Sequence, residues 1–337
     1  MYIKLLFPFF IFVLPHQRAM TFTNSTGGAN QTELGEAFEK LQCTFGLTET
    51  MYVHLVYISA FNFLLSITAL LGNALILVAL FKDSSLHPPS KLLLRCLAST
   101  DICIGLIAEP LGIIRWISMV KEDWALCRYS LPSYIISGYT LSSVSLLTIT
   151  AISVDRLLAL VLGLRYRQVV TLKRTYVIVV TFWVVSMAAA SSYLVNEVIT
   201  FWYGQLLILS CIFTSTICYT KIFLILRQHH RIQERGHGQR ERPNRTISLN
   251  IARYRKAVSS ALWLQFVLVV CYLPYGVMST LLNRSELSSS SFLPWQLAVT
   301  LIYLNSSLNP FLYCWKIPEV RQAVKNTTTQ VLCCSSS

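Results

Sequence analysis

The chain has 337 residues, of which 54% are hydrophobic and only 13% are charged. Soluble domains carry about 25% charged residues, so this composition excludes an ordinary soluble protein and indicates one embedded in a lipid bilayer. The formal net charge of +13 would suggest nucleic-acid binding in a soluble protein. The sequence contains no Gly-rich phosphate loop, no paired CxxC metal spacing and no repeat of fixed period.

The first 19 residues look like a secretory signal peptide. Lys4 precedes an apolar core over Leu5–Leu14, which is too short for a membrane span of about 20 residues. The cleavage site is poor, so an uncleaved targeting segment is the alternative. Residues 20–51 are polar and hold glycosylation sequences at Asn24 and Asn30. We therefore predict an extracellular N-terminal segment that is glycosylated at both asparagines.

Seven apolar segments follow, and each is long enough to cross a bilayer. Helices are expected because a spanning segment must satisfy its own backbone hydrogen bonds in lipid. We therefore predict an all-α membrane protein, a seven-transmembrane helix bundle over residues 52–315. The predicted spans are Tyr52–Phe81, Lys91–Ile117, Ser130–Val161, Thr175–Leu194, Glu197–Leu226, Lys256–Leu282 and Ser291–Trp315.

Most of the 28 Lys and Arg residues lie in loops on the side of the C-terminus, above all in Arg227–Arg255. Because such residues stay on the cytoplasmic side, we predict a cytoplasmic C-terminus and an extracellular N-terminus. This arrangement fits a multi-pass plasma-membrane protein. The positive charge then reflects orientation and attraction to the anionic inner leaflet of the lipid bilayer, and no nucleic-acid partner is expected.

Asp101 is the ionisable residue buried deepest in the predicted bundle. A carboxylate at such a depth costs about 2.5–3.5 kcal/mol on insertion scales and needs partners. No Lys or Arg lies at a comparable depth, but amide and hydroxyl side chains do. An acid among oxygen ligands is typical of a cation site. The alternative is a polar network that only holds helices together. The candidate partners are Asn73, Ser145, Asn305, Ser306 and Asn309.

Each predicted helix also carries one distinctive residue or motif. Prolines kink two of these helices, because proline removes a backbone donor and clashes with the preceding turn. These positions are Gly72-Asn73, Asp101 in LASTD, Asp155-Arg156, Trp183, Tyr219, Cys271 with Pro274, and Asn309-Pro310-x-x-Tyr313. Together and in this order, over about Leu71–Tyr313, they resemble the rhodopsin-like (class A) G-protein-coupled receptors.

The resemblance implies a receptor that passes an extracellular ligand signal to a heterotrimeric G protein. Arg156 would be held by Asp155 in the inactive state, and would meet Tyr219 and the G protein when the sixth helix moves outward. Leu164 would insert into the Gα subunit, and arrestin is a further partner that the family allows. Asn309, Pro310 and Tyr313 would belong to the same switch.

The resemblance also implies a sodium site and a lipid-anchored tail. The sodium ion would lie among Asp101, Ser145, Asn305, Ser306 and Asn309. Cys333 and Cys334 would be palmitoylated and would anchor a short amphipathic helix around Pro318–Lys325. That helix would lie in a cytoplasmic tail over residues 316–337.

The chain departs from the family pattern at several positions. Leu157 replaces the usual Tyr after Asp-Arg, Tyr272 replaces the usual Trp before the sixth-helix Pro, and Cys211 stands near the position of the fifth-helix Pro. The sixth helix also lacks the acidic residue that often locks the Arg, since residues 253–256 read RYRK. These departures suggest a looser inactive state with some basal activity.

Two of the ten cysteines, Cys43 and Cys127, lie on the predicted outer side, where oxidising conditions allow disulfides. The family normally bridges the top of the third helix to the loop after the fourth, but the short loop around Tyr193–Glu197 has no cysteine. We therefore predict a Cys43–Cys127 bridge. Two free thiols are the alternative.

The ligand site is expected among inward-facing residues of the outer half. Amine receptors of the family carry an Asp where this chain has Gly138, so a biogenic amine is not expected. Aromatic and hydroxyl groups suit a small, weakly polar ligand, although aromatic residues at helical spacing also serve as packing. The missing fifth-helix Pro and the Cys-free loop resemble the melanocortin, lipid, cannabinoid and adenosine receptors, which leaves peptides, lipids and nucleosides open. The chosen residues are Tyr139, Ser142, Tyr203, Tyr272, Tyr275 and Tyr303, with Glu109 near the rim.

Other functions fit the sequence less well. A transporter or channel would show paired half-repeats, interrupted helices and more charges along a path. A membrane enzyme would need a catalytic or metal constellation, and the six His residues lie outside the helices or near their ends. A receptor-like protein that does not signal, or one that is constitutively active, remains a further alternative. We expect no enzymatic activity and no cofactor other than a bound sodium ion.

Overall fold

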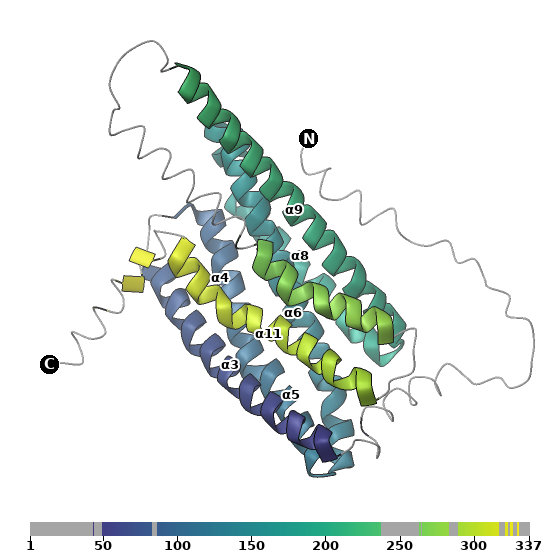
Figure 1. Ribbon diagram of the computed structural model, residues 1–337. Helices are drawn as coiled ribbons and strands as arrows, with labels where there is room; N and C mark the ends of the chain where they lie inside the picture. The colour runs from purple at the N-terminus through teal and green to yellow at the C-terminus, as the bar shows by residue number, and fades with distance from the viewer. Residues whose placement is uncertain are drawn as a thin grey trace, which may run out of the picture.

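The structure, a computed structural model, describes residues 43, 49–82, 86–236, 263, 265–282, 289–316, 321–322, 324–325 and 329. It is an elongated bundle of helices that run along one another (Figure 1). The helices of the bundle are α3 (Glu49–Lys82), α4 (Pro88–Cys103), η2 (Ile104–Ala108), α5 (Glu109–Val120), α6 (Trp124–Leu162), α8 (Leu172–Ser191), α9 (Glu197–Gly236), Gln265–Leu282 and α11 (Ser289–Lys316).

Six of the described helical stretches are long and apolar enough to cross a membrane. The segments α4, η2 and α5 form one of them, Pro88–Val120. The seventh span is α11, a helix of 28 residues that carries more polar side chains. Each predicted span coincides with one of these helices, apart from the start of the sixth, which lies outside the described residues. The predicted seven-helix bundle is therefore confirmed.

The outer surface of the bundle carries apolar side chains, as expected for a surface in contact with lipid. Large apolar side chains such as Phe63 on α3 and Val184 on α8 are more than half exposed. In water such a surface would cause aggregation, but in a bilayer it contacts acyl chains. Polar side chains instead lie between the helices, because exposing polar groups to lipid is unfavourable. The bundle is thus apolar outside and partly polar inside.

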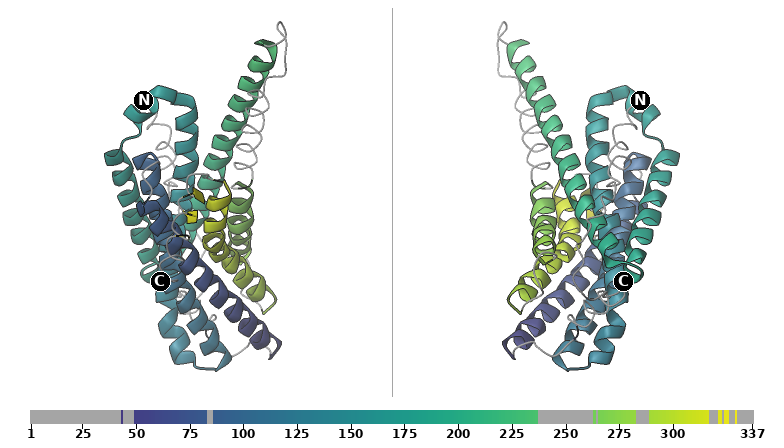
Figure 2. Two further views of the ribbon diagram at one scale, coloured as in Figure 1. Left: turned by 90° about the vertical axis from the view of Figure 1, so that its left-hand side faces the viewer. Right: turned by 90° about the vertical axis from the view of Figure 1, so that its right-hand side faces the viewer.

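Polar contacts join α3 to α11, which lie side by side in the bundle (Figures 1 and 2). The Asn62 side chain donates to Thr300 Oγ1 at 3.1 Å, and Asn73 donates to the Ser306 carbonyl oxygen at 3.0 Å. Pro310 packs against Gly72, where an added Cβ would lie 2.8 Å from the proline ring. The glycine therefore allows the two helices to approach closely.

Short connections fix the ends of the long helices. The turn after α5 leads into α6, where Asp123 caps the helix by accepting a hydrogen bond from Leu126 N at 3.0 Å. At its other end α6 stops at Gly163, whose φ of 50° suits glycine. A 3-10 turn, η3 (Gly163–Arg165), and the short helix α7 (Tyr166–Val169) follow.

The end of α9 projects beyond the rest of the bundle (Figure 2). The predicted short loop before α9 is confirmed, since only η4 (Ser192–Leu194) and two further residues separate α8 from α9. Several predictions lie outside the described residues, namely the signal peptide, the glycosylation sites Asn24 and Asn30, and the palmitoylation sites Cys333 and Cys334. Of the predicted tail helix, residues 321–322 and 324–325 are described and are helical.

Candidate functional site

Asp155 lies near the end of α6 and both of its carboxylate oxygens are engaged. The Tyr166 hydroxyl donates to one oxygen at 2.6 Å, and the Ser90 hydroxyl donates to the other at 2.7 Å. Ser90 comes from the first turn of α4 and Tyr166 from α7, so the carboxylate ties three elements together. The His87 ring packs on Tyr166 at a centroid distance of 5.0 Å. The site is therefore a closed cluster around a buried acid.

Arg156, the next residue, is exposed. Asp155 accepts hydrogen bonds from two hydroxyl groups, and no ion pair joins it to Arg156 in this structure. The role of Asp155 as the restraint on Arg156 in the inactive state stays a prediction. We define the Arg156 end of the bundle by this exposed cation and the cluster around Asp155.

Of the other predicted switch residues, Tyr219 and Leu164 lie at the Arg156 end, while Asn309 bonds to Asp101 and Pro310 packs against Gly72. Tyr219 is buried and its hydroxyl accepts a hydrogen bond from Ser153 at 2.9 Å, so it contacts α6 one turn before Arg156. Tyr313 is buried in the core. Leu164 is 99% exposed on η3, a costly position for a leucine that has no partner. The Arg156 end thus combines a buried tyrosine on α9 with an exposed cation and an exposed leucine.

Asp101 lies in the middle of the bundle and is fully buried. It accepts hydrogen bonds from Asn309 Nδ2 at 2.7 Å and from Ser145 Oγ at 3.3 Å, which connects α4 with α11 and α6. Asn305 and Ser306, the other predicted members, are buried on α11. The Ser306 hydroxyl lies near Asp101 and makes no hydrogen bond with any described residue. The five residues predicted from the sequence therefore come together.

A π-helical stretch, η2, interrupts the second span above Asp101. A π-helical turn is wider than an α-helical one. Pro110 explains it, because proline cannot donate a backbone hydrogen bond and its ring would clash with the preceding turn of an α-helix. The Glu109 N–H instead bonds to the Ile104 carbonyl oxygen, five residues back. The Ser66 hydroxyl donates to the Gly105 carbonyl oxygen at 2.7 Å and satisfies a group in the widened turn.

The extra residue in η2 changes the direction of Glu109. In a continuous α-helix each residue advances by about 100°, so Glu109 would lie about 80° around the helix from Asp101. One inserted residue reduces this offset to about 20°. Glu109 is accordingly fully buried and faces the interior of the bundle. Neither of its oxygens has a hydrogen-bond partner among the described residues.

Tyrosines fill the interior at the level above Asp101. The hydroxyls of Tyr139 on α6 and Tyr275 on the sixth span are 2.6 Å apart, and Tyr203 bonds to Ser186 at 3.2 Å. The Tyr303 hydroxyl lies 3.0 Å from where a Cβ of residue 138 would stand, so Gly138 makes room for it. The predicted residues Tyr272, Tyr275 and Tyr303 are buried, while Tyr139, Ser142 and Tyr203 are half-buried.

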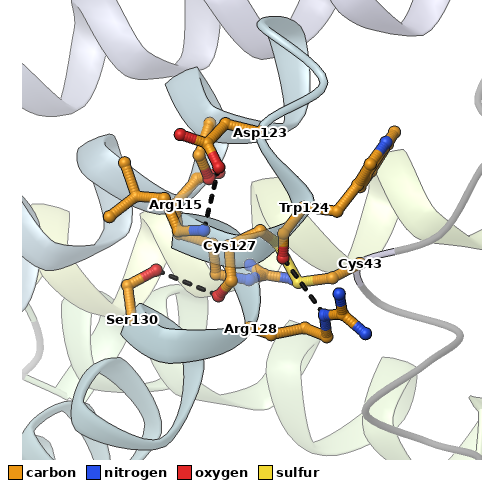
Figure 3. Close-up of a disulfide and its surroundings, with 9 residues drawn as sticks. Cys43, Arg115, Asp123, Trp124, Cys127, Arg128 and Ser130 are labelled. Atoms are coloured by element: carbon orange, nitrogen blue, oxygen red, sulfur yellow. Dashed lines mark hydrogen bonds between the residues drawn. A yellow bond between two sulfur atoms is a disulfide. The ribbon is translucent and has the colours of Figure 1, made fainter.

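The predicted bridge between Cys43 and Cys127 is formed (Figure 3). It ties the segment before α3 to the first turn of α6, with a Cα–Cα distance of 5.9 Å. Both cysteines are buried, and Arg115 of α5 lies beside the bridge (Figure 3). Nearby, Trp116 Nε1 donates to Gln296 Oε1 at 3.1 Å and joins α5 to α11. We call this the disulfide end of the bundle.

The family described as "7 transmembrane receptor (rhodopsin family)" matches residues 72–201 and 191–313. The chain belongs to the rhodopsin family of seven-transmembrane receptors. It is also similar to the sheep (Ovis aries) adenosine receptor A3, with 24% identity over 300 residues that cover 82% of this chain and 90% of the relative. Family members are receptors and not enzymes, so the expected absence of enzymatic activity is confirmed. The receptor is a multi-pass protein of the plasma membrane.

Sequence reasoning missed three features of the receptor's interior. It did not anticipate Ser90 and Tyr166 as partners of Asp155, because both come from other helices and carry no signal beyond a hydroxyl. It did not anticipate η2, although Pro110 directly after a buried acid is a usable signal. It also placed no function on Arg115, which is fully buried at the disulfide end.

Proposed function

We propose that the receptor binds an extracellular ligand among the buried tyrosines and Glu109, and activates a heterotrimeric G protein at the Arg156 end. The disulfide end is then extracellular and the Arg156 end cytoplasmic. The single observation that supports this most is the state of Arg156. The Arg156 guanidinium is exposed at the end of the bundle, beside the hydrogen-bonded cluster around Asp155, and is therefore accessible to a protein partner. The same surface also suits arrestin.

The exposed leucine strengthens the proposal of a protein partner. Leu164 lies close in sequence to Arg156 and is 99% exposed, on a turn that connects α6 to α7. Insertion of such a side chain into a groove on Gα would bury it and contribute about 1.5–3 kcal/mol. The cation and the leucine together fit a partner surface that offers an acceptor and an apolar pocket.

We propose sodium as the ion that the Asp101 cluster would hold. Asp101 supplies a carboxylate, and Ser145 and Ser306 supply hydroxyl oxygens, which are the ligands that hard cations prefer. The Ser306 hydroxyl is buried without a hydrogen bond and so has a free acceptor. The ion would supply positive charge to a buried acid, while Asn309 already donates to the same carboxylate.

The ligand is proposed to be a nucleoside, a peptide or a lipid. A nucleoside comes first for testing, because the similar sheep protein is an adenosine receptor. Gly138 leaves α6 without the acid that amine receptors use, and the Tyr303 hydroxyl occupies the space beside it. This argues against a biogenic amine anchored on that helix.

The proposal is tested with reporters of G-protein activation in cells that express the receptor. Each Gα class is assayed first without added compound, then with adenosine, and then with peptide and lipid libraries. We expect activation of at least one Gα class that Arg156→Ala abolishes and that Lys173→Ala, an exposed control on α8, preserves. Activation that is unchanged in Arg156→Ala would contradict the proposed mechanism.

Ligand-independent signalling is a second candidate, favoured by one observation. Asp155, the usual restraint on Arg156, is bound by Tyr166 and Ser90 instead. A receptor that lacks this restraint should activate its G protein in the absence of ligand. Output equal to that of mock-transfected cells, at matched surface expression, would exclude this candidate.

A further inference from the structure

Glu109 is a buried acid that the bundle itself does not satisfy. Its side chain is fully buried, and both carboxylate oxygens lack a hydrogen-bond partner among the described residues. Buried polar groups are nearly always paired, and an unpaired charge in a membrane interior costs several kcal/mol. Such a carboxyl is neutral while it stands alone, and a cation that enters the interior would ionise it and pair with it.

The surroundings of Glu109 indicate which kind of group is missing. Its electrostatic neighbours are Asp101, which is another acid, and the phenols of Tyr134 and Tyr303. None of these supplies a positive charge. A buried cation, Arg115, lies 5.5 Å from the centre of the Tyr134 ring and also acts on Tyr303, so the same aromatic walls already accommodate one guanidinium. An acid beside aromatic walls favours a further cation that carries N–H donors.

The direction of the side chain is built into the second span. The π-helical turn η2 rotates Glu109 onto the face of Asp101, which points into the bundle. That turn is held by Ser66 and permitted by Gly105, where an added Cβ would lie 2.8 Å from the Ser66 carbonyl oxygen. The acid is therefore aimed inward by a specific irregularity of the backbone, and irregularities of this kind are frequent at functional sites.

Tyr303 and Gly138 place Glu109 within the proposed ligand site. The Tyr303 hydroxyl lies over Gly138 of α6, at 3.0 Å from the position of an added Cβ. The carboxylate and this phenol thus approach the same part of the interior from α5 and α11. The acid that amine receptors carry on the third helix is absent here, and an acid on the second span faces the interior instead.

We infer that Glu109 anchors a protonated nitrogen of the extracellular ligand, such as an amidinium, a guanidinium or a basic amine. The inference rests on the proposed function and, of the three ligand classes named there, it favours peptides with a basic side chain over nucleosides, which are neutral. The carboxylate accepts the charge-assisted hydrogen bond, next to the phenols of Tyr134 and Tyr303.

The first test uses ligand-free receptor in lipid nanodiscs and needs no ligand. Glu109→Gln keeps the size of the side chain and removes the titratable group. Because a buried carboxyl without a partner is neutral, we expect its unfolding temperature to stay within about 1 °C of the wild-type value, as in Glu122→Gln, the same change at an exposed acid. A fall of about 3 °C or more in Glu109→Gln alone would mean that a protein group pairs with the acid, and would overturn the inference.

The second test uses benzamidine, a planar aromatic cation, and benzamide, its neutral analogue of the same shape. Benzamidine should raise the unfolding temperature of the wild-type receptor by about 1–2 °C, and benzamide should not. The effect should vanish in Glu109→Gln and persist in Asp101→Asn, which isolates Glu109 from the lower acid. Equal effects of the two probes, no effect of benzamidine, or a persistent effect in Glu109→Gln overturns the inference.

Failure of the inference can be told apart from failure of the proposed function. Arg156→Ala should abolish G-protein activation and leave the benzamidine effect intact, because the two groups lie at different levels of the bundle. If no Gα class is activated but stabilisation by benzamidine depends on Glu109, the proposed G-protein activation is refuted and the inference about Glu109 is supported. If activation depends on Arg156 but benzamidine has no effect, the proposed G-protein activation is supported and the inference about Glu109 is refuted.

Discussion

Removal of the Cys43–Cys127 bridge should destabilise the receptor by several kcal/mol. The bridge spans a sequence separation of 84 residues, for which the chain-entropy expression gives about 4.6 kcal/mol at 25 °C. This value is an upper bound, because α3 and the second span lie inside the closed loop and remain helical in a membrane after tertiary contacts are lost. We therefore expect a loss of about 2–4 kcal/mol from Cys43→Ser.

The assay is thermal unfolding of purified receptor in lipid nanodiscs. Cys43→Ser and Cys127→Ser should each lower the unfolding temperature by about 5 °C or more, and the double variant should equal either single one, since both remove the same covalent link. Cys103→Ser, at a half-buried free thiol, is the matched control. Additive effects of the two single variants, or a wild-type unfolding temperature in Cys43→Ser, would refute the reasoning.

Three further predictions concern polar contacts inside the bundle. Tyr166→Phe removes a 2.6 Å hydrogen bond to Asp155, worth about 1.5–3 kcal/mol for a charged acceptor, and frees the acid to restrain Arg156. Basal Gα nucleotide exchange should fall roughly 10- to 150-fold, and an unchanged rate, or a similar fall in the exposed-phenol control Tyr176→Phe, would contradict this. Asp101→Asn should abolish stabilisation by NaCl relative to choline chloride in thermal unfolding, and a retained sodium effect would place the ion elsewhere. Tyr139→Phe should cost about 0.5–1.5 kcal/mol, and addition of Tyr275→Phe should cost little more in a double-mutant cycle; two full, additive losses would show that the hydroxyls do not interact.

The fold of the receptor could be predicted from the sequence because lipid leaves few choices. A long apolar segment must be helical in a bilayer, so the seven spans followed from composition and length. The Asp101 cluster was also predictable, because a buried acid needs partners and only a few polar side chains lie at its depth. The Cys43–Cys127 bridge followed from the topology and the family pattern.

The partners of Asp155 could not be predicted in the same way. Ser90 is 65 residues away in the sequence and Tyr166 is 11 residues away, and their contacts depend on how α4 and α7 pack. Residue type favours Arg156 as the partner of Asp155, but neighbouring residues of a helix point in different directions. The direction of the Glu109 side chain depended on η2, which changes the helical phase by one residue and turns the side chain toward the interior.

The measurement that tests the central claim most directly is Gα nucleotide exchange with purified receptor in lipid vesicles. Wild-type receptor, Arg156→Ala and Lys173→Ala are compared at equal density and with each Gα class in turn. The account predicts that wild type and Lys173→Ala accelerate exchange on the same Gα class, and that Arg156→Ala does not. Equal acceleration by all three proteins, or no acceleration on any Gα class with or without adenosine, peptides and lipids, would contradict it.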